Sequence, residues 1–392
     1  MKSIYLDYAA TTPADPAVVK AMLPYFTEHF GNPSSLHSFG QEAKRAVETA
    51  RASVASLIGA QAGEIVFTSG GTESDNFALK GAVAARKEKG NHIITTVIEH
   101  HAVLETCHDL EQQGCRVTYL PVDRYGAVDP DAVKNAVTNK TILISIMHAN
   151  NEVGTIQPLA EIGKIARAND IYFHTDAVQT FGHIPIDVNE LNVDLLSASG
   201  HKLYGPKGVG IIYIRKGTRV EPFLRGGGQE KGRRSSTHNV PGIVGMGKAS
   251  ELSGKLLQEE AIVIGALRDK LIRGVLDNID ETKLNGHATQ RLPNNVNITI
   301  NYIEGEAMVM NLDIEGIACS SGSSCSSASS AASHVLAALG PLPSLPHGSL
   351  RFSLGKATTA EDIDTVLMIL PRIVRNLRSL SPRYRKKEKL GK

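Results

Sequence analysis

Lys202 closes the segment Ser199-Gly200-His201-Lys202, shortly after the largely apolar run 193–196. We interpret that run as a buried strand, so the lysine lies where an unpaired ammonium group is costly. A lysine in such a place is paired with a charge, has a lowered pKa, or forms an imine, and the last possibility makes it a Schiff-base lysine. The alternative is an exposed lysine in a strand-to-loop turn.

A carboxylate that could serve the same site lies upstream of Lys202. The run 171–175 leads to Asp176 at the end of an expected strand, followed by Gln179 in an Asp-x-x-Gln pattern. Pyridoxal phosphate requires a Schiff-base lysine and a carboxylate opposite its pyridinium nitrogen. Asp176 and Lys202 together therefore predict a pyridoxal phosphate site.

The turn 68–74, Thr-Ser-Gly-Gly-Thr-Glu-Ser, joins an expected strand to a helix that begins near Glu73. Gly70 and Gly71 allow a phosphate to approach the backbone, the helix N-terminus offers amides, and Thr72 adds a hydroxyl. The turn has neither the Walker lysine nor the dinucleotide-binding spacing, so it predicts another kind of phosphate site. An ordinary capped turn is the alternative.

Polar residues also follow two other expected strands. His100 and His101 come after Glu99, and since adjacent histidines point in different directions, we expect no metal site there. An imidazole lying flat on a heteroaromatic ring is the preferred interpretation. Asn150 and Asn151 offer amides that could bind a ligand or stabilise a turn.

Cys325 lies in the middle of a serine-rich stretch, 320–330, whose composition is that of a flexible linker. A linker needs no thiol, so we interpret Cys325 as a nucleophile rather than a structural cysteine. Cys319, beside an apolar run, is expected to pack as a small hydrophobic residue, as are Cys107 and Cys115.

Arg351 lies in an expected strand between apolar neighbours, a place where arginine binds a planar anion. That anion is either a substrate carboxylate or a structural Asp or Glu. The basic tail from Arg383 is interpreted as a solvated, disordered end, with partner docking as the alternative.

The composition excludes several classes of protein. With 42% hydrophobic residues and a formal net charge of +2, the 392-residue chain is expected to be globular and to bind neither nucleic acid nor membrane. Four cysteines without a Cys-x-x-Cys pair make no disulfide framework and indicate a reducing compartment. The N-terminus lacks the apolar core of a signal peptide, and no stretch is long enough to span a bilayer, so a cytoplasmic protein is expected.

Seven apolar strands separated by helices predict an α/β fold with a mostly parallel sheet, covered on both faces, and ligands at the strand carboxyl ends. A long helix over 240–278 should lead to a smaller α+β C-terminal domain. The expected parts are an N-terminal arm 1–14, a helical segment 15–60 that covers the site or joins the small domain, a large cofactor-binding domain 61–255, a small domain 256–380 with the Cys325 loop, and a basic tail 381–392.

Together these segments resemble the cysteine desulfurases of the NifS/IscS type, which are class V pyridoxal phosphate enzymes of fold type I. The resemblance covers nearly the whole chain. The motifs that carry it, in family order, are the segments 31–35, 68–74, 150–154, 174–179, 199–202 and 321–325.

The resemblance implies a role for each predicted site residue. Lys202 forms the Schiff base and moves a proton at the substrate Cα, Asp176 pairs with the pyridine nitrogen, and Gln179 contacts the ring hydroxyl. His100 stacks on the ring. The phosphate is held by four residues of the same chain and by a threonine from the other subunit of a homodimer: Gly71, Thr72, Ser199, His201 and, from the partner, Thr237. In this chain Ser236 precedes that threonine where the family commonly has glycine.

The resemblance also implies the reaction. Asn151 and Arg351 bind L-cysteine, the latter through its carboxylate, and Cys325 takes the sulfur as a persulfide while L-alanine is released. The sulfur then passes to an iron–sulfur scaffold or another acceptor protein. The alternatives are a selenocysteine lyase, another class V enzyme, or a pyridoxal-binding regulatory protein without turnover.

Overall fold

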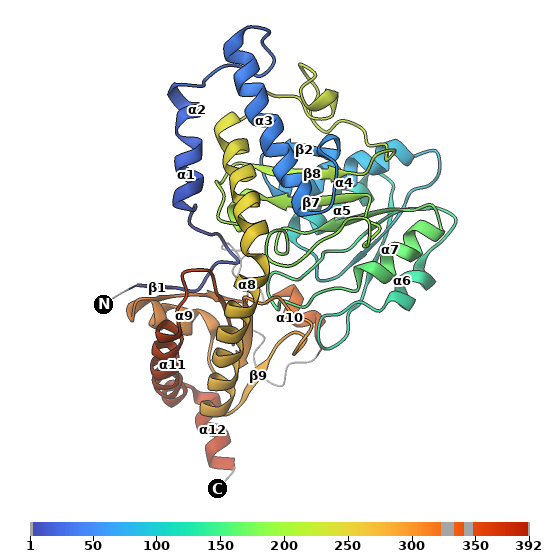
Figure 1. The fold of residues 1–392 in the computed structure, drawn as a ribbon. Helices are drawn as coiled ribbons and strands as arrows, with labels where there is room; N and C mark the ends of the chain where they lie inside the picture. The colour runs from blue at the N-terminus through green and yellow to red at the C-terminus, as the bar shows by residue number, and fades with distance from the viewer. Residues whose placement is uncertain (1–2, 323–332, 341–347, 391–392) are drawn as a thin grey trace.

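The computed structural model describes residues 3–322, 333–340 and 348–390. A large part is built on a seven-stranded sheet and a smaller part on a four-stranded sheet (Figure 1). The helix α8, Val240–Asn278, runs along both parts and joins them. This agrees with the predicted long helix over 240–278.

The large sheet is the predicted mostly parallel one. Its order is β2-β8-β7-β6-β5-β3-β4, and only β8 runs antiparallel to its neighbours. The strands span Ile65–Thr68 (β2), His92–Thr96 (β3), Arg116–Leu120 (β4), Thr141–Ser145 (β5), Tyr172–Asp176 (β6), Leu195–Ser199 (β7) and Gly210–Ile214 (β8). Six of them are buried along their whole length or nearly so, because both faces of the sheet are covered.

Helices cover both faces of this sheet. On one face α4 (Gly71–Arg86) and α5 (His101–Gln112) bury Phe77 and Val103 against β3, β5 and β7. On the other face lie α6 (Pro130–Ala136), α7 (Leu159–Ala168) and α3 (Ser38–Leu57). This arrangement confirms the α/β prediction.

The predicted helical segment 15–60 forms α1 (Pro16–Met22), α2 (Pro24–Thr27) and α3. Asp15 caps α1 as expected, with Oδ1 accepting a hydrogen bond from Ala17 N at 2.7 Å. Val47 and Val54 of α3 pack in the same core cluster as the large sheet and the first turns of α8. The structure thus favours a cover on the large part over membership of the small one, while the division at 255/256, inside α8, stays a prediction.

The small sheet has the order β12-β13-β10-β9, all pairs antiparallel. Its strands are Thr282–Leu284 (β9), Asn295–Ile300 (β10), Ser320–Ser321 (β12) and Ser349–Ser353 (β13), and they pack with α9 (Gly305–Ile314) and α11 (Ala360–Leu380). The N-terminal strand β1 (Ile4–Tyr5) pairs with β11 (Ile317–Ala318), so the arm reaches across to this part.

The prediction of a disordered tail was wrong up to Leu390, because the chain forms α12, Pro382–Leu390. Tyr384 anchors it, with its ring 5.6 Å from that of Tyr302 and beneath the guanidinium of Arg378. None of the helices in the described ranges has the length and apolarity needed to cross a bilayer.

Candidate active site

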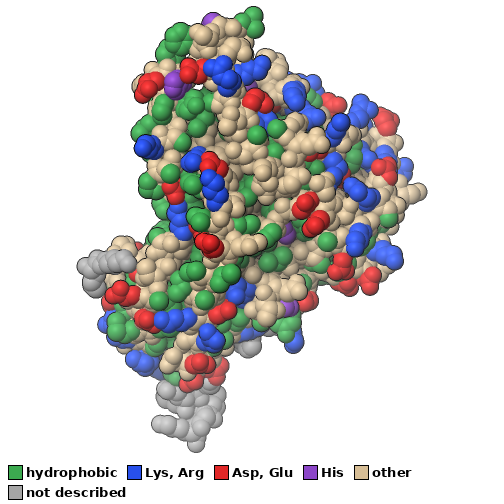
Figure 2. Space-filling model, in the orientation of Figure 1, with side chains coloured by type: hydrophobic (Ala, Val, Ile, Leu, Met, Phe, Trp, Pro, Cys, Tyr) green, Lys and Arg blue, Asp and Glu red, His purple; other side chains and the backbone are tan. Residues whose placement is uncertain are grey.

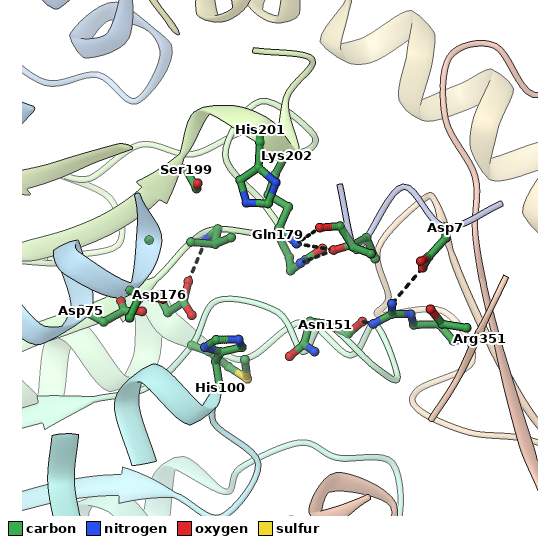
Figure 3. Close-up of a pocket in the computed structure, with 17 residues that line it drawn as sticks. Asp7, Asp75, His100, Asn151, Asp176, Gln179, Ser199, His201, Lys202 and Arg351 are labelled. Carbon is green, nitrogen blue, oxygen red and sulfur yellow. Dashed lines mark hydrogen bonds and ion pairs between the residues drawn. The ribbon is translucent and has the colours of Figure 1, made fainter. Parts of the chain in front are cut away.

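A cavity of about 420 Å³ lies where the carboxyl ends of the large sheet meet β12 and β13 of the small one. This size suits a small cofactor together with a substrate. Figure 3 shows Asp176 at one end, Arg351 at the other and Lys202 between them. The cavity brings together ten of the residues predicted from the sequence, namely Gly71, Thr72, His100, Asn151, Asp176, Gln179, Ser199, His201, Lys202 and Arg351.

Asp176 ends β6 and is 6% exposed. Its Oδ1 accepts a hydrogen bond from Val178 N at 2.8 Å. Burial raises the pKa of Asp176, while the nearby His100 and Lys202 lower it. A carboxylate at this depth is stabilised by a cationic partner, and a protonated pyridine nitrogen is such a partner. The residues at this end of the cavity therefore fit pyridoxal phosphate.

Lys202 follows β7 through the 3₁₀ turn Gly200–Lys202, which directs its side chain into the cavity. Its Nζ donates hydrogen bonds to two carbonyl oxygens of the N-terminal arm, those of Ala9 and, at 2.8 Å, Ala10. Gln179 Nε2 also donates to the Ala9 oxygen, at 3.1 Å. The arm thus forms one wall of the site and holds the lysine that the sequence singled out.

The phosphate-binding prediction falls on the N-terminus of α4. Gly71 packs so closely that a Cβ there would come within 2.8 Å of Val178 Cγ2. A side cavity beside this N-terminus is lined by Thr72, Ser199 and His201, so backbone amides and hydroxyl groups face the same space. Burial is the main cause that lowers the pKa of His201, to about 4, so this imidazole is neutral and can donate a single hydrogen bond to an anion.

His100 stands directly before α5 and caps it, with Nδ1 accepting from Ala102 N at 3.1 Å. Because Nδ1 is an acceptor, the proton of the neutral ring lies on Nε2. Burial lowers the pKa of His100, and Asp176 partly opposes this. The capping bond fixes the ring at the cavity wall, where it can lie against a flat cofactor.

Arg351, in β13, is 3% exposed and lies opposite Asp176 in the cavity. Its Nη2 donates to Asp7 Oδ1 at 2.9 Å and its Nη1 to the backbone oxygen of Asn151 at 3.2 Å. Its Nε is buried without an acceptor among the described residues. The sequence left open a structural acid or a substrate carboxylate. The structure shows the acid, Asp7, and the two hydrogen bonds use two of the five guanidinium N–H groups, so the guanidinium can also bind an incoming anion.

Cys325 lies outside the described residues. Five positions earlier, Ser320 of β12 lines the cavity, so the covalent chain keeps Cys325 within about 18 Å of Ser320. Cys319 is buried in the small core, as predicted, and burial raises the pKa of its thiol to about 12. Cys107 is likewise buried in the core, whereas Cys115 is partly exposed. A thiol as weakly acidic as that of Cys319 makes a poor nucleophile.

Thr237 does not line this cavity. It borders a smaller one, of about 150 Å³, together with Thr68, Ser69 and Glu230. Ser236 before it has φ of 151°, a backbone conformation that favours glycine. The role assigned to Thr237 requires a second subunit, so it stays a prediction.

Sequence reasoning missed several residues at the site, among them three acidic or hydroxyl side chains and one lysine. Asp7, Asp75 and Ser320 line the main cavity, and Lys207 lines the side cavity. Asp75 could have been recognised, because it is an acidic residue among the residues that α4 buries. Asp7 and Ser320 had none, since only the pairing of β12 and β13 brings Ser320 beside Arg351.

Comparisons with known proteins agree with this geometry. The family Aminotransferase class-V matches residues 4–366. The chain is 58% identical to a cysteine desulfurase IscS of Methanosarcina thermophila over 97% of this chain and 94% of that protein. It is 55% identical to a cysteine desulfurase IscS of Dictyoglomus turgidum over 100% of this chain and 99% of that one.

Solved structures give the same result. A NifS-like protein superimposes with a TM-score of 0.90 at 40% identity, covering 96% of this chain and all of that one. A structure described as SspA in complex with cysteine superimposes with a TM-score of 0.79 at 38% identity, covering 90% and 99% of the two chains. The chain therefore belongs to the class-V aminotransferase family and, within it, to the cysteine desulfurases of the NifS/IscS type.

Proposed function

We propose that this protein is a pyridoxal phosphate-dependent cysteine desulfurase, which converts L-cysteine to L-alanine and places the sulfur on Cys325. The observation that carries the proposal is the order of groups along one cavity. Asp176 and Lys202 suit the cofactor, Arg351 suits the substrate carboxylate, and Ser320 brings the chain that leads to Cys325 to the same wall.

The cofactor, when bound, supplies an electron sink that acidifies the substrate Cα. Asp176 stabilises its protonated ring nitrogen, His100 lies against its ring, and Thr72, Ser199 and His201 bind its phosphate. Arg351 orients the substrate by its carboxylate, assisted by Asn151. Lys202 Nζ, held over the cavity by the arm carbonyls, takes the Cα proton and returns it.

Cys325 performs the sulfur transfer. Its thiolate attacks the substrate sulfur, so that a sulfur–sulfur bond forms as the carbon–sulfur bond breaks. The released carbon takes a proton and becomes the methyl group of alanine, and the extra sulfur stays on Cys325 as a persulfide. A selenocysteine lyase would need no such persulfide, which makes the sulfur on Cys325 the distinguishing product.

The functional unit is a homodimer that brings Thr237 of one subunit to the phosphate of the other. Two observations support this. Thr237 does not line the main cavity of its own chain. Apolar side chains gather on the surface of α1 and α2 (Figure 2), where Leu23 is 58% and Phe26 is 60% exposed, as expected of a surface that a second copy covers.

The persulfide sulfur passes to an iron–sulfur scaffold or another acceptor protein, as the IscS name of the relatives implies, in the cytoplasm expected from the sequence.

Isotope-labelled cysteine tests the proposal. The purified yellow protein should release one alanine for each sulfur retained, and peptide mass spectrometry should find the labelled sulfur on Cys325. Sulfur on Cys319, or pyruvate in place of alanine, would contradict it. Sedimentation of the wild type against a Phe26→Glu variant tests the dimer separately.

A further inference from the structure

Behind Asp176 lies a second buried acid, Asp75 of α4. Its residue is 1% exposed, it lines the same cavity, and Figure 3 shows it beside Asp176. Asp75 Oδ1 has no hydrogen-bond donor among the described residues. By contrast, the third buried acid nearby, Glu99, accepts hydrogen bonds from Thr96 Oγ1 at 2.7 Å and from the backbone nitrogen of Met147.

A row of hydrogen bonds crosses three neighbouring strands beside Asp75. Asp75 Oδ1 lies 3.6 Å from Nε2 of His174, a member of that row. Ser197 Oγ lies 3.0 Å from Nε2 of His174 in β6, and His174 Nδ1 lies 2.8 Å from Ser145 Oγ in β5. The register of the sheet sets this row, because Ser145 pairs with His174 and Ser197 pairs with Asp176.

His174 is neutral, because burial lowers its pKa to about 3. Its proton lies either on Nε2, which then donates to Ser197 Oγ, or on Nδ1, which then donates to Ser145 Oγ. In both cases the row adds no positive charge beside Asp75.

The surroundings favour the neutral acid. Two carboxylates so close together in a buried site repel each other, and only one of them can be ionised cheaply. Burial, and then Asp176, raise the pKa of Asp75 well above its ordinary value. His174 Nε2 lies 3.6 Å from Asp75 Oδ1 but is neutral, so it supplies no compensating charge. His100 and Lys202 lower the pKa of Asp176, but they do not lower the pKa of Asp75.

We propose that Asp75 is a positioning residue that stays protonated and so leaves the negative charge of this buried cluster on Asp176. A neutral Asp75 places no second negative charge beside Asp176. Asp176 thereby remains a full carboxylate for the cofactor nitrogen. This inference rests on the role of Asp176 in the proposed function.

Infrared difference spectroscopy on the cofactor-bound protein tests the proposal directly. The spectrum should contain a carbonyl band of a neutral carboxylic acid that shifts in D₂O. The band should vanish in Asp75→Asn and persist in Asp176→Asn, and Glu99→Gln identifies any second band of this kind. A spectrum of Asp75→Asn that keeps every neutral-acid band of the wild type would overturn the proposal.

A separate measurement tests the role of Asp176 in cofactor binding. Asp176→Asn should weaken cofactor binding by at least about tenfold, the loss of one charge-assisted hydrogen bond. Unchanged affinity in that variant would overturn the assigned role of Asp176, while the infrared band would still report on Asp75.

Discussion

Replacing Arg351 by alanine should remove the recognition of the substrate carboxylate. The guanidinium is 3% exposed, so its charge-assisted hydrogen bond to an anion is made away from bulk water. Such a bond contributes about 1.5–3 kcal/mol. Since 1.36 kcal/mol is tenfold in rate, kcat/KM for cysteine should fall by about 13- to 160-fold.

The assay compares cysteine with cysteamine, which has the thiol and the amine but no carboxylate. In the wild type cysteine should be the better substrate by at least the factor above, and in Arg351→Ala the ratio of the two kcat/KM values should fall by that factor. Cofactor absorbance should be retained, because Arg351 lies at the opposite end of the cavity from Asp176.

A control is needed because Arg351→Ala also leaves Asp7 without its partner at 2.9 Å. Asp7→Asn breaks the same ion pair but keeps the guanidinium, so it should retain the preference for cysteine over cysteamine. An unchanged ratio in Arg351→Ala, or an equal loss in Asp7→Asn, would refute the assignment of Arg351 as the carboxylate-binding residue.

Three further predictions follow from the same geometry. Lys202→Ala should lose turnover and the borohydride-reducible link to the cofactor but keep measurable cofactor binding through the phosphate site; normal turnover would disprove its role. Cys325→Ala should bind cofactor and cysteine, with the accompanying spectral change, but form no persulfide and release no alanine, whereas Cys319→Ala should stay active because its buried thiol has a pKa of about 12. Glu230 accepts hydrogen bonds from Arg51 at 2.7 and 2.8 Å, and although burial raises its pKa, His238 and Arg51 lower it from 4.5 to about 2. The folded-state value is the lower one, so Glu230 should contribute about 3 kcal/mol that is present above pH 4.5 and is lost as the pH falls toward 2. The unfolding free-energy difference between the wild type and Glu230→Gln should therefore shrink on acidification, and a pH-independent difference would contradict this.

Much of the site could be predicted because its motifs are local. A strand end, a glycine turn and a helix start are set by a few consecutive residues, so Asp176, Thr72 and Lys202 were recognisable from their flanking sequence. In an α/β fold such strand ends meet at one edge of the sheet, and the structure brings these three residues into one cavity, as expected.

The local sequence pattern led to a wrong prediction for the C-terminal tail. A run of basic residues is typical of a solvated end, yet this run forms α12. The ring of Tyr384 packs against the ring of Tyr302, which lies 82 positions earlier in the chain. Helical propensity alone would leave so short a helix marginal in water, and the tertiary contact supplies the missing stabilisation.

The sequence by itself determined the fold class, the cofactor and most of the residues around it, because these depend on periodicity and on short motifs. Only the tertiary structure decided which acid pairs with Arg351 and which acid lies behind Asp176. Asp7 is 344 positions from Arg351, and Asp75 comes within 3.6 Å of His174 only because α4 packs across β6 and β7. Such contacts depend on strand order, register and helix packing. These features arise from the burial of the whole core and cannot be predicted from the residues that neighbour each side chain in the sequence.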